Sequence, residues 1–220
     1  MNANKRQALV LMAHADDETL GAGGTILHML ATGWEVNVVL LTDGKIATRS
    51  TGVDDNRSAA FEACEILGCN PPTILGFADQ KFDNYPIADI ANEVFQLNLE
   101  PDLIITHSPF DLNGDHKITY EVAMIIGRPR YRRTSILSAE IPKNNFWNGR
   151  AFNPNYFVDV SDYMDAKLRA FEAYKNEAKE YPHAFSTGGL KLLAEYHGFH
   201  SGYGLAEGFN VVRGYSNSLP

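Results

Sequence analysis

The sequence predicts an α/β protein in which helices cover both faces of a mostly parallel sheet, a three-layer Rossmann-like arrangement. Two observations predict this fold class. Short, nearly continuous apolar stretches alternate along the chain with longer stretches of helical period. Apolar runs without polar alternation are typical of parallel strands that are buried on both faces. The chain of 220 residues is 45% hydrophobic, so we expect one domain over residues 1–220 with a full core.

Six apolar runs are the expected strands. Each is long enough for a strand and too short for a buried helix. Pro101 and Asp102 introduce the fourth run, where a turn must end before the strand starts. In chain order, the expected strands cover residues 9–13, 36–42, 73–77, 103–107, 135–141 and 156–160.

Helical stretches separate these strands, and several have a recognisable start or stop. Gly33 and Gly68 are expected C-terminal stops, because glycine adopts the left-handed conformation that ends many helices. Residues 54–56 (Asp-Asp-Asn) and Asp115 are expected N-terminal caps. The glycine-rich segment at about 198–220 is expected to be irregular, either a lid or an interface with a second copy of the chain. The expected helices cover about residues 18–31, 57–67, 87–99, 115–126, 163–179 and 190–196.

Composition argues against several classes of partner. The formal net charge is -8, which disfavours both nucleic acids and anionic membrane surfaces. The apolar run at 8–13 is far too short to span a membrane, and no signal-peptide cleavage pattern follows it. Cys64 and Cys69 match neither a redox motif nor a zinc ribbon and are expected to be reduced thiols. We expect a soluble cytoplasmic protein that acts on a small molecule.

The stretch ALVLMAHADDET at residues 8–19 places an imidazole and three carboxylates directly after the first strand. His14 and Asp17 are three residues apart, so in a helical turn they share a face and can converge on one metal ion. Catalytic zinc sites usually have three protein ligands and one open position. A third ligand is therefore expected from another strand end.

The segment HSPFDLNGDH at residues 107–116 also leaves a strand and enters a helix. His116 is the expected third ligand, because it opens that helix beside Asp115. His107, at the strand end, is the alternative ligand and otherwise lines the pocket. Histidine and carboxylate ligands at two strand ends predict a divalent metal site at the carboxyl edge of the sheet.

Asp16 lies between two expected ligands and should point toward the open coordination position. A carboxylate there can take a proton from a water molecule, so Asp16 is the expected general base. Glu18 and Asp115 are expected to orient the ligands. The alternative is that Asp16 and Asp17 only cap the following helix, whose first turn favours acidic residues.

Two motifs resemble those of a known family. AHADDETLGAGG is similar to the AHPDDExLGxGG signature of the zinc-dependent N-acetylglucosaminyl deacetylases, the LmbE-like or PIG-L family, and THSPFDLNGDH is similar to the family's second motif. The segment FNPNYFVDVSDYMDAKLRAFEAYKNEAKEYPH resembles bacterial members associated with surface-glycan precursors. The resemblance implies a Rossmann-like fold and removal of the N-acetyl group from an amino sugar or its conjugate. It implies Zn²⁺ as the cofactor, although Fe²⁺ or another divalent ion suits the same ligands.

Carried over residue by residue, the resemblance makes His14, Asp17 and His116 the ligands and Asp16 the base. Arg57 falls where members place an arginine that contacts the far end of the substrate; an ordinary surface arginine is the alternative.

Further contacts are expected around the reacting amide. Asn113 or His107 is expected to donate to the oxyanion, and Asp111 either binds sugar hydroxyls or forms a turn. The sugar is free, nucleotide-linked or lipid-linked, and the sequence leaves these forms open.

The chain departs from the family pattern at two positions near the motifs. Ala15 stands where proline is usual, and Asn113 stands where some members carry a histidine. An amide cannot deliver a proton, so the general acid is either Asp16 in its protonated form or one of three histidines nearer the C-terminus. Those histidines are His183, His197 and His200.

Two other functions remain to be distinguished from deacetylation. Two histidines and one carboxylate also form the metal site of Fe(II) oxygenases, although those enzymes usually use a β-sandwich. Gly21–Gly24 would be the phosphate loop of a nucleotide-binding module, but the glycines lie inside a helix and lack the GxGxxG spacing. Close packing of that helix on the sheet explains them better.

Overall fold

The computed structural model describes residues 5–42, 56–130, 132–216 and 218–220. Within these residues seven strands form one sheet in the order β3-β2-β1-β4-β5-β7-β6. The strands are β1 (Gln7–Met12), β2 (Glu35–Thr42), β3 (Thr73–Phe77), β4 (Leu103–His107), β5 (Ser135–Ala139), β6 (Tyr156–Asp159) and β7 (Ala206–Arg213). The helices are α1 (Asp17–Ala31), α2 (Arg57–Leu67), α3 (Ile87–Phe95), α4 (Gly114–Ile126), α5 (Asn144–Trp147), α6 (Met164–Glu172) and α7 (Thr187–Ser201), and η1 (Phe82–Asn84) is a 3-10 turn.

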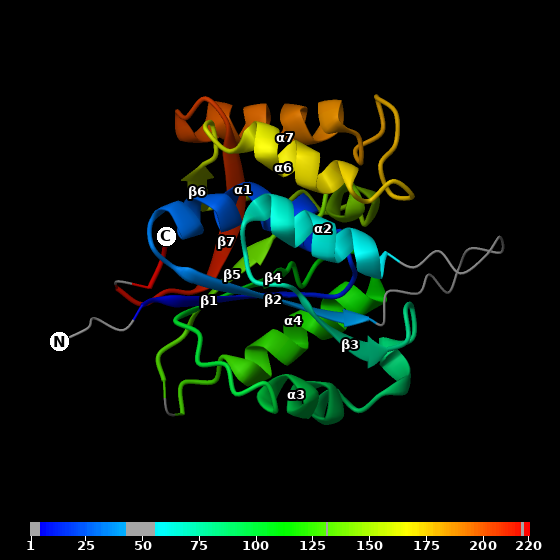
Figure 1. The fold of residues 1–220 in the computed structure, drawn as a ribbon, viewed down its shortest axis with the longest axis vertical. Helices are drawn as coiled ribbons and strands as arrows, with labels where there is room; N and C mark the ends of the chain where they lie inside the picture. The colour runs from blue at the N-terminus through cyan, green and yellow to red at the C-terminus, as the bar shows by residue number, and fades with distance from the viewer. Residues whose placement is uncertain (1–4, 43–55, 131, 217) are drawn as a thin grey trace.

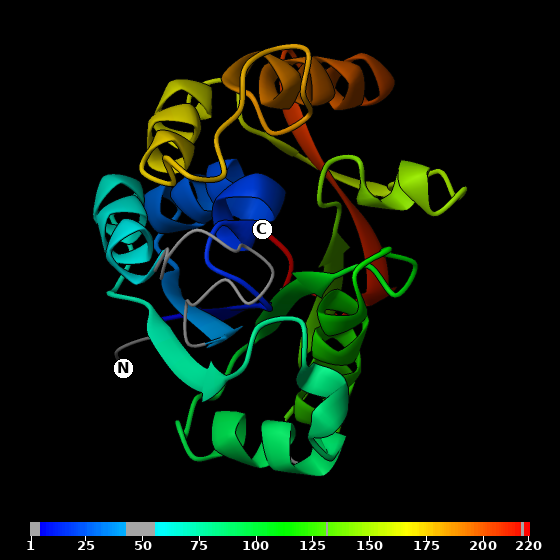
Figure 2. The ribbon, with the colours of Figure 1, turned by 90° about the vertical axis from the view of Figure 1, so that its right-hand side faces the viewer.

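The sheet lies between two layers of helices. Helices α1, α2, α6 and α7 cover one face, and α3 and α4 cover the other (Figure 1). The same separation is visible at right angles, with the green helices α3 and α4 alone below the sheet (Figure 2). Strands β1 to β5 pair in parallel, whereas β7 runs antiparallel to both β5 and β6. The predicted three-layer α/β class is confirmed. No described helix has the length and apolar character needed to cross a membrane.

The prediction of an irregular segment at 198–220 is wrong. Helix α7 continues to Ser201, and β7 then lies inside the sheet between β5 and β6. The strand was missed because its sequence, AEGFNVVR, begins with a charge and a glycine. Glu207 is nevertheless buried, since Lys167 of α6 pairs with it. A lid formed by this segment is therefore excluded.

Other elements differ at their ends. The helix expected at 163–179 covers only Met164–Glu172, and the one expected at 87–99 ends at Phe95. The helix expected at 190–196 is longer, Thr187–Ser201. Gly68 ends α2 in the left-handed conformation, as expected. The expected cap residues Asp54 and Asp55 lie outside the described residues.

The glycines of α1 serve close packing. A Cβ atom on Gly24 would lie 2.6 Å from Cγ1 of Val160, and one on Gly21 would lie 3.2 Å from Cβ of Ala139. The Gly24 N–H donates to Glu207 at 2.8 Å, so it is not available to a phosphate. These contacts support the packing interpretation and argue against a nucleotide-binding loop.

The chain order reverses beside β1, which pairs with β2 on one side and with β4 on the other. Connections on the two sides leave in opposite directions there, and ligands of open α/β sheets bind at the carboxyl ends of such strands. His14 follows β1 and His116 follows β4. The topology therefore brings together the two segments in which metal ligands were expected.

Candidate metal centre

Three donor atoms from the two motifs meet at the carboxyl edge of the sheet. Nδ1 of His14 lies 3.1 Å from Nε2 of His116 and 3.2 Å from Oδ2 of Asp17. Nε2 of His116 lies 3.3 Å from the same Asp17 oxygen. A tetrahedral shell about 2.0–2.1 Å from zinc has edges of about 3.3 Å, so the three donors fit one small divalent ion. The buried cluster has the composition and spacing to bind a metal.

Carboxylates hold the outer nitrogens of both imidazoles. Nε2 of His14 lies 3.0 Å from Asp79 Oδ1 and 3.2 Å from Asp115 Oδ2. Nδ1 of His116 lies 2.9 Å from Asp111 Oδ2. A carboxylate on the outer nitrogen keeps the proton there, and the inner nitrogen then directs its lone pair at the ion. Two further possible donor sets, His107–Asp111–His116 and His14–Asp79–Asp115, share a histidine with the first.

The charges of the cluster also fit a cation. Burial opposes ionisation of Asp17, but the two neighbouring imidazoles, the charge of His116 above all, hold its pKa well below the usual range. Burial likewise opposes protonation of His116, yet Asp17 and Asp111 raise its pKa to about 9. Both shifts come from the close approach of carboxylate and imidazole groups, and the carboxylates of such a cluster are also suited to a divalent ion.

Asp16 has the features expected of a base that faces the reacting atoms. Its backbone adopts φ 131°, a region that favours glycine, so the surrounding structure imposes the conformation. Within the described parts of the chain, no group hydrogen bonds to its carboxylate, and this N-cap position has no side-chain capping bond. Burial, and then the charge of Asp17, raise the Asp16 pKa well above the usual range. Helix capping therefore does not explain Asp16.

Glu18 acts on Asp16 and not on a metal ligand. Its side chain accepts a hydrogen bond from the Asp16 N–H at 3.2 Å and another from the Tyr174 hydroxyl. Burial raises its pKa to about 7. These contacts link Glu18 to the strained turn, and its role in orienting the ligands stays a prediction. Asp115, in contrast, lies beside His14 as expected, and it also accepts the Gln80 and Phe82 N–H groups.

His107 does not line a pocket, because it is fully buried beneath the cluster. Its Nε2 accepts the Ala13 N–H at 2.9 Å, and its ring stacks on His116 with centroids 3.8 Å apart. Burial lowers its pKa to about 4, so the ring is neutral. Its Nδ1 has no hydrogen-bond partner among the described residues, and His107 forms a possible donor group with Asp111 and His116, so its roles as alternative ligand and oxyanion donor stay predictions.

Asp111 and Asn113 form hydrogen bonds within the protein that their expected roles did not include. Asp111 is fully buried and accepts hydrogen bonds from the Asn113 N–H and the Asn144 amide, besides its contact with His116. It is not available to sugar hydroxyls. Asn113, and not Asp115, is the N-cap of α4, since its side-chain oxygen accepts the Asp115 N–H at 2.9 Å. Only the Asn113 amide nitrogen is left to meet an oxyanion, and that role stays a prediction.

The remaining expected residues lie farther from the donors. Arg57 is exposed at the start of α2, with its guanidinium carbon 5.9 Å from the centroid of Phe61, and its substrate role stays a prediction. His197 is buried 3.3 Å from Glu140, and His200 is exposed on α7. Burial and then the charge of Lys143 lower the pKa of His183, and the charge of Asp16 in turn opposes the lowering of the Lys143 pKa by burial.

Several side chains of the site were not found by sequence reasoning. Asp79 follows β3, so its place after a strand end was a usable signal. Tyr174 and Asn144 carry no local signal, because their partners are 156 and 33 residues away. Lys143 has φ 71° and places its ammonium 3.9 Å from the centroid of Phe185. Burial lowers its pKa, while the charges of Asp16 and Glu177 oppose that shift.

Comparisons with known proteins identify the family and the fold. Residues 9–126 match the family model "GlcNAc-PI de-N-acetylase" (PIG-L). The chain is 27% identical to diacetylchitobiose deacetylase of Thermococcus kodakarensis over 95% of its own length and 84% of the relative's. It is 25% identical to 4-oxalmesaconate hydratase of Pseudomonas putida, over 78% and 74% of the two chains. The solved structure of N,N'-diacetylchitobiose deacetylase from Pyrococcus horikoshii has a TM-score of 0.76 at 21% identity, over 95% and 84%.

The family match covers both motifs and more than half of the chain. It argues against the Fe(II) oxygenase alternative, as does the three-layer fold. The chain belongs to the PIG-L family of GlcNAc-PI de-N-acetylases.

Proposed function

We propose that this protein is a metal-dependent N-deacetylase that releases acetate from an N-acetylated amino sugar or its conjugate and leaves a free amine. The observation that carries the proposal is the convergence of three donors next in sequence to Asp16, whose backbone is strained and whose carboxylate has no hydrogen-bond partner among the described residues. Nitrogen and oxygen donors of this number suit Zn²⁺, and Fe²⁺ would bind the same set. His14, Asp17 and His116 would hold the ion.

The ion, when bound, supplies positive charge that polarises an amide carbonyl and makes a nearby water molecule more acidic. Asp16 accepts the proton of that water as it attacks the carbonyl carbon. The Asp16 pKa is raised well above its usual range by burial and then by the charge of Asp17, and a more basic carboxylate is better able to accept the proton. Asp16 then passes the proton to the leaving amine. His183, beside Lys143, is the alternative donor for that last step.

The surroundings of the donors suit a sugar. Helix α5 is tied to the loop before α4, since Asn144 bonds Asp111 and Asn148 bonds the Phe110 carbonyl. Phe110 and Trp147, which is 65% exposed, remain accessible there. The C–H faces of sugar rings pack well on exposed aromatic rings. The Lys143 ammonium, 5.0 Å from the Trp147 centroid, adds a hydrogen-bond donor for a sugar oxygen or a phosphate.

An acetate-release assay tests the proposal. Purified protein is incubated with N-acetylglucosamine, diacetylchitobiose, UDP-N-acetylglucosamine and a lipid-linked N-acetylglucosamine, each with and without a chelator. We expect acetate from at least one substrate, loss of release with the chelator, and recovery when Zn²⁺ is restored. Release that is unaffected by metal removal would overturn the metal-dependent mechanism.

A hydratase reaction is the competing outcome, because one relative is a 4-oxalmesaconate hydratase. Such an activity adds water to a carbon–carbon double bond and produces no acetate. Loss of ultraviolet absorbance from an unsaturated dicarboxylate, without acetate from any acetylated sugar, would contradict the proposed function.

A further inference from the structure

A second cavity lies at the other end of the sheet from the metal centre. Its volume is about 520 Å³, which is within the usual range for sites that bind small molecules. Pro101 and Thr134, at the amino ends of β4 and β5, are among the residues that line it. The metal donors follow the carboxyl ends of the parallel strands, so neither the proposed base nor any expected ligand contributes to this cavity.

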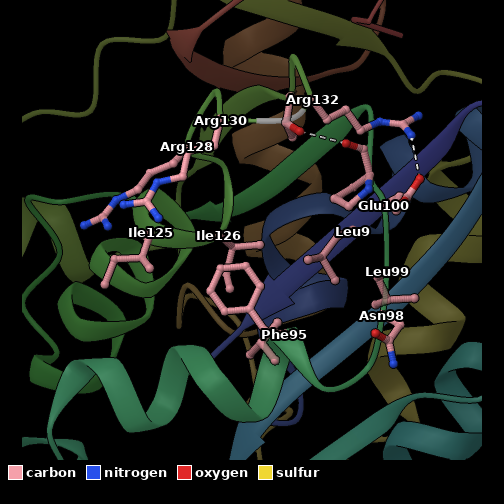
Figure 3. A pocket seen from close by; sticks show the side chains of 13 residues that line it. Leu9, Phe95, Asn98, Leu99, Glu100, Ile125, Ile126, Arg128, Arg130 and Arg132 are labelled. Carbon is pink, nitrogen blue, oxygen red and sulfur yellow. Dashed lines mark hydrogen bonds and ion pairs between the residues drawn. The ribbon is translucent and has the colours of Figure 1, made fainter.

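The floor of the cavity is apolar. Figure 3 shows Phe95 and Ile126 at its centre, with Leu9 and Leu99 to one side and Ile125 to the other. Phe95, the last residue of α3, is 50% exposed. An accessible aromatic ring in a concave apolar site gains free energy when an apolar group of a ligand covers it.

The rim of the cavity is cationic. Arg128, Arg130 and Arg132 line it, and they come from RPRYRR at residues 128–133, in a protein whose formal net charge is -8. Figure 3 shows Arg128 and Arg130 along one side of the opening and Arg132 turned toward Glu100 on the other.

Acidic side chains among the described residues neutralise one of these three charges, that of Arg132. Arg132 lies 3.3 Å from Glu100 and 2.6 Å from Asp102. In the part of the chain that the structure describes, neither Arg128 nor Arg130 forms an ion pair. Two guanidinium groups therefore remain beside an apolar floor, and guanidinium is the side chain best suited to a phosphate or carboxylate.

We propose that this cavity is a binding site for an amphipathic anion, a molecule with a phosphate or carboxylate head and a short apolar tail. The head lies between Arg128 and Arg130, and the tail covers Phe95 and Ile126. A free metabolite and a lipid headgroup with its chain share this chemistry. The site does not depend on the proposed deacetylase reaction.

Calorimetric titration of the full chain tests the proposal. Octyl phosphate and octanoate are the probes, while inorganic phosphate, octanol and octyltrimethylammonium test the head, the tail and the sign of charge. We expect the two anionic probes to bind about ten-fold more tightly than any of the other three. Equal affinity for octyl phosphate and inorganic phosphate, or for octyl phosphate and the cation, would overturn the proposal.

Matched variants locate the binding. The double variant Arg128→Ala/Arg130→Ala should weaken octyl phosphate binding by about ten-fold or more. The control Arg133→Ala/Arg169→Ala removes the same charge from exposed positions that do not line the cavity, and it should bind within about two-fold of the parent. Phe95→Ala should weaken octyl phosphate and leave inorganic phosphate unchanged. Equal losses in the two double variants would contradict the proposal.

Vesicles distinguish the two sources of the anion. Binding of the protein to phosphatidylglycerol vesicles but not to phosphatidylcholine vesicles, lost in Arg128→Ala/Arg130→Ala, supports a lipid headgroup. Octyl phosphate binding without vesicle binding supports a free metabolite. Sedimentation compares the oligomeric states of the parent and of this double variant. If the parent is an oligomer and the variant is a monomer, the cavity is an interface between copies and the proposal fails. Acetate release should be unchanged in this variant, so failure here is separate from failure of the proposed function.

Discussion

Helix α1 connects two buried charge clusters that are built in opposite ways. In the middle of the helix, Glu207 of β7 accepts the Gly24 N–H at 2.8 Å and the Thr25 N–H at 2.7 Å. Its Oε1 also lies 2.6 Å from Nζ of Lys167, which donates to the Leu20 carbonyl as well. Each charge in this cluster is paired, and the pair joins α1, α6 and β7.

At the start of the same helix, the charges are not balanced by the protein in this way. The inner nitrogens of His14 and His116 face Asp17 and each other, and the carboxylate of the neighbouring Asp16 accepts no hydrogen bond from the described residues. The backbone of Asp16 is strained. The buried charge of Glu207, which serves the fold, is thus neutralised by Lys167. The charges proposed to serve catalysis are instead arranged to bind a cation and a substrate. The predictions below test this difference.

The largest expected effect is on stability at the paired cluster. Lys167→Met should lower the free energy of unfolding by about 3–5 kcal/mol, because Glu207 stays buried without its partner. Urea denaturation measures the change. Arg169→Met, on the exposed side of the same helix, should change it by less than about 0.5 kcal/mol. Similar values for the two variants would mean that the buried pair contributes little.

At the metal centre we expect the opposite result, a loss of activity without a loss of stability. Asp16→Asn should keep the metal and lower kcat by about 10²–10⁴-fold, since an amide cannot accept the proton of water. The free energy of unfolding should not fall, because the substitution removes a charge from beside Asp17. Metal analysis, acetate release and urea denaturation measure the three quantities. His14→Ala should lose the metal as well. Full activity of Asp16→Asn would rule out Asp16 as the base.

Metal binding should stabilise the protein only through the donors His14, Asp17 and His116. A divalent ion at 100 times its Kd should add about 2.7 kcal/mol to the free energy of unfolding. The Lys167→Met protein should show the same increment, whereas His116→Ala should show none. Thermal unfolding with and without chelator provides the measurement. An increment that persists in His116→Ala would place the ion elsewhere.

A smaller effect is expected from the carboxylate behind His14. Asp79→Asn should weaken metal affinity by about 10–100-fold, because the outer nitrogen loses its anionic partner. Asp89→Asn, at an exposed position of α3, is the matched control and should leave the affinity unchanged. Competition with a chromophoric chelator measures both. Equal affinities in the two variants would show that Asp79 does not support the ligand.

The sequence predicted the α/β class and most strands, because an apolar run bounded by turn residues is a local signal. The predicted elements were wrong where a residue far away in the chain decides whether a side chain is buried. Strand β7 was missed because its sequence contains the charged Glu207. Lys167, which neutralises that charge, lies 40 residues away in the chain. The helix expected at 163–179 is shorter because the chain turns after Ala173, where Tyr174 reaches Glu18 in the core.

The sequence alone determined which residue types stand after the first and fourth strands, and this was sufficient to predict a metal site from His14, Asp17 and His116. Only the tertiary structure decided that Asp79 and Asp111 support those side chains together with Asp115, and that His107 and Asp111 are fully buried. The reason is physical: a local pattern fixes where a side chain leaves the backbone, but packing of segments far apart in the chain determines its partners, its exposure and its charge.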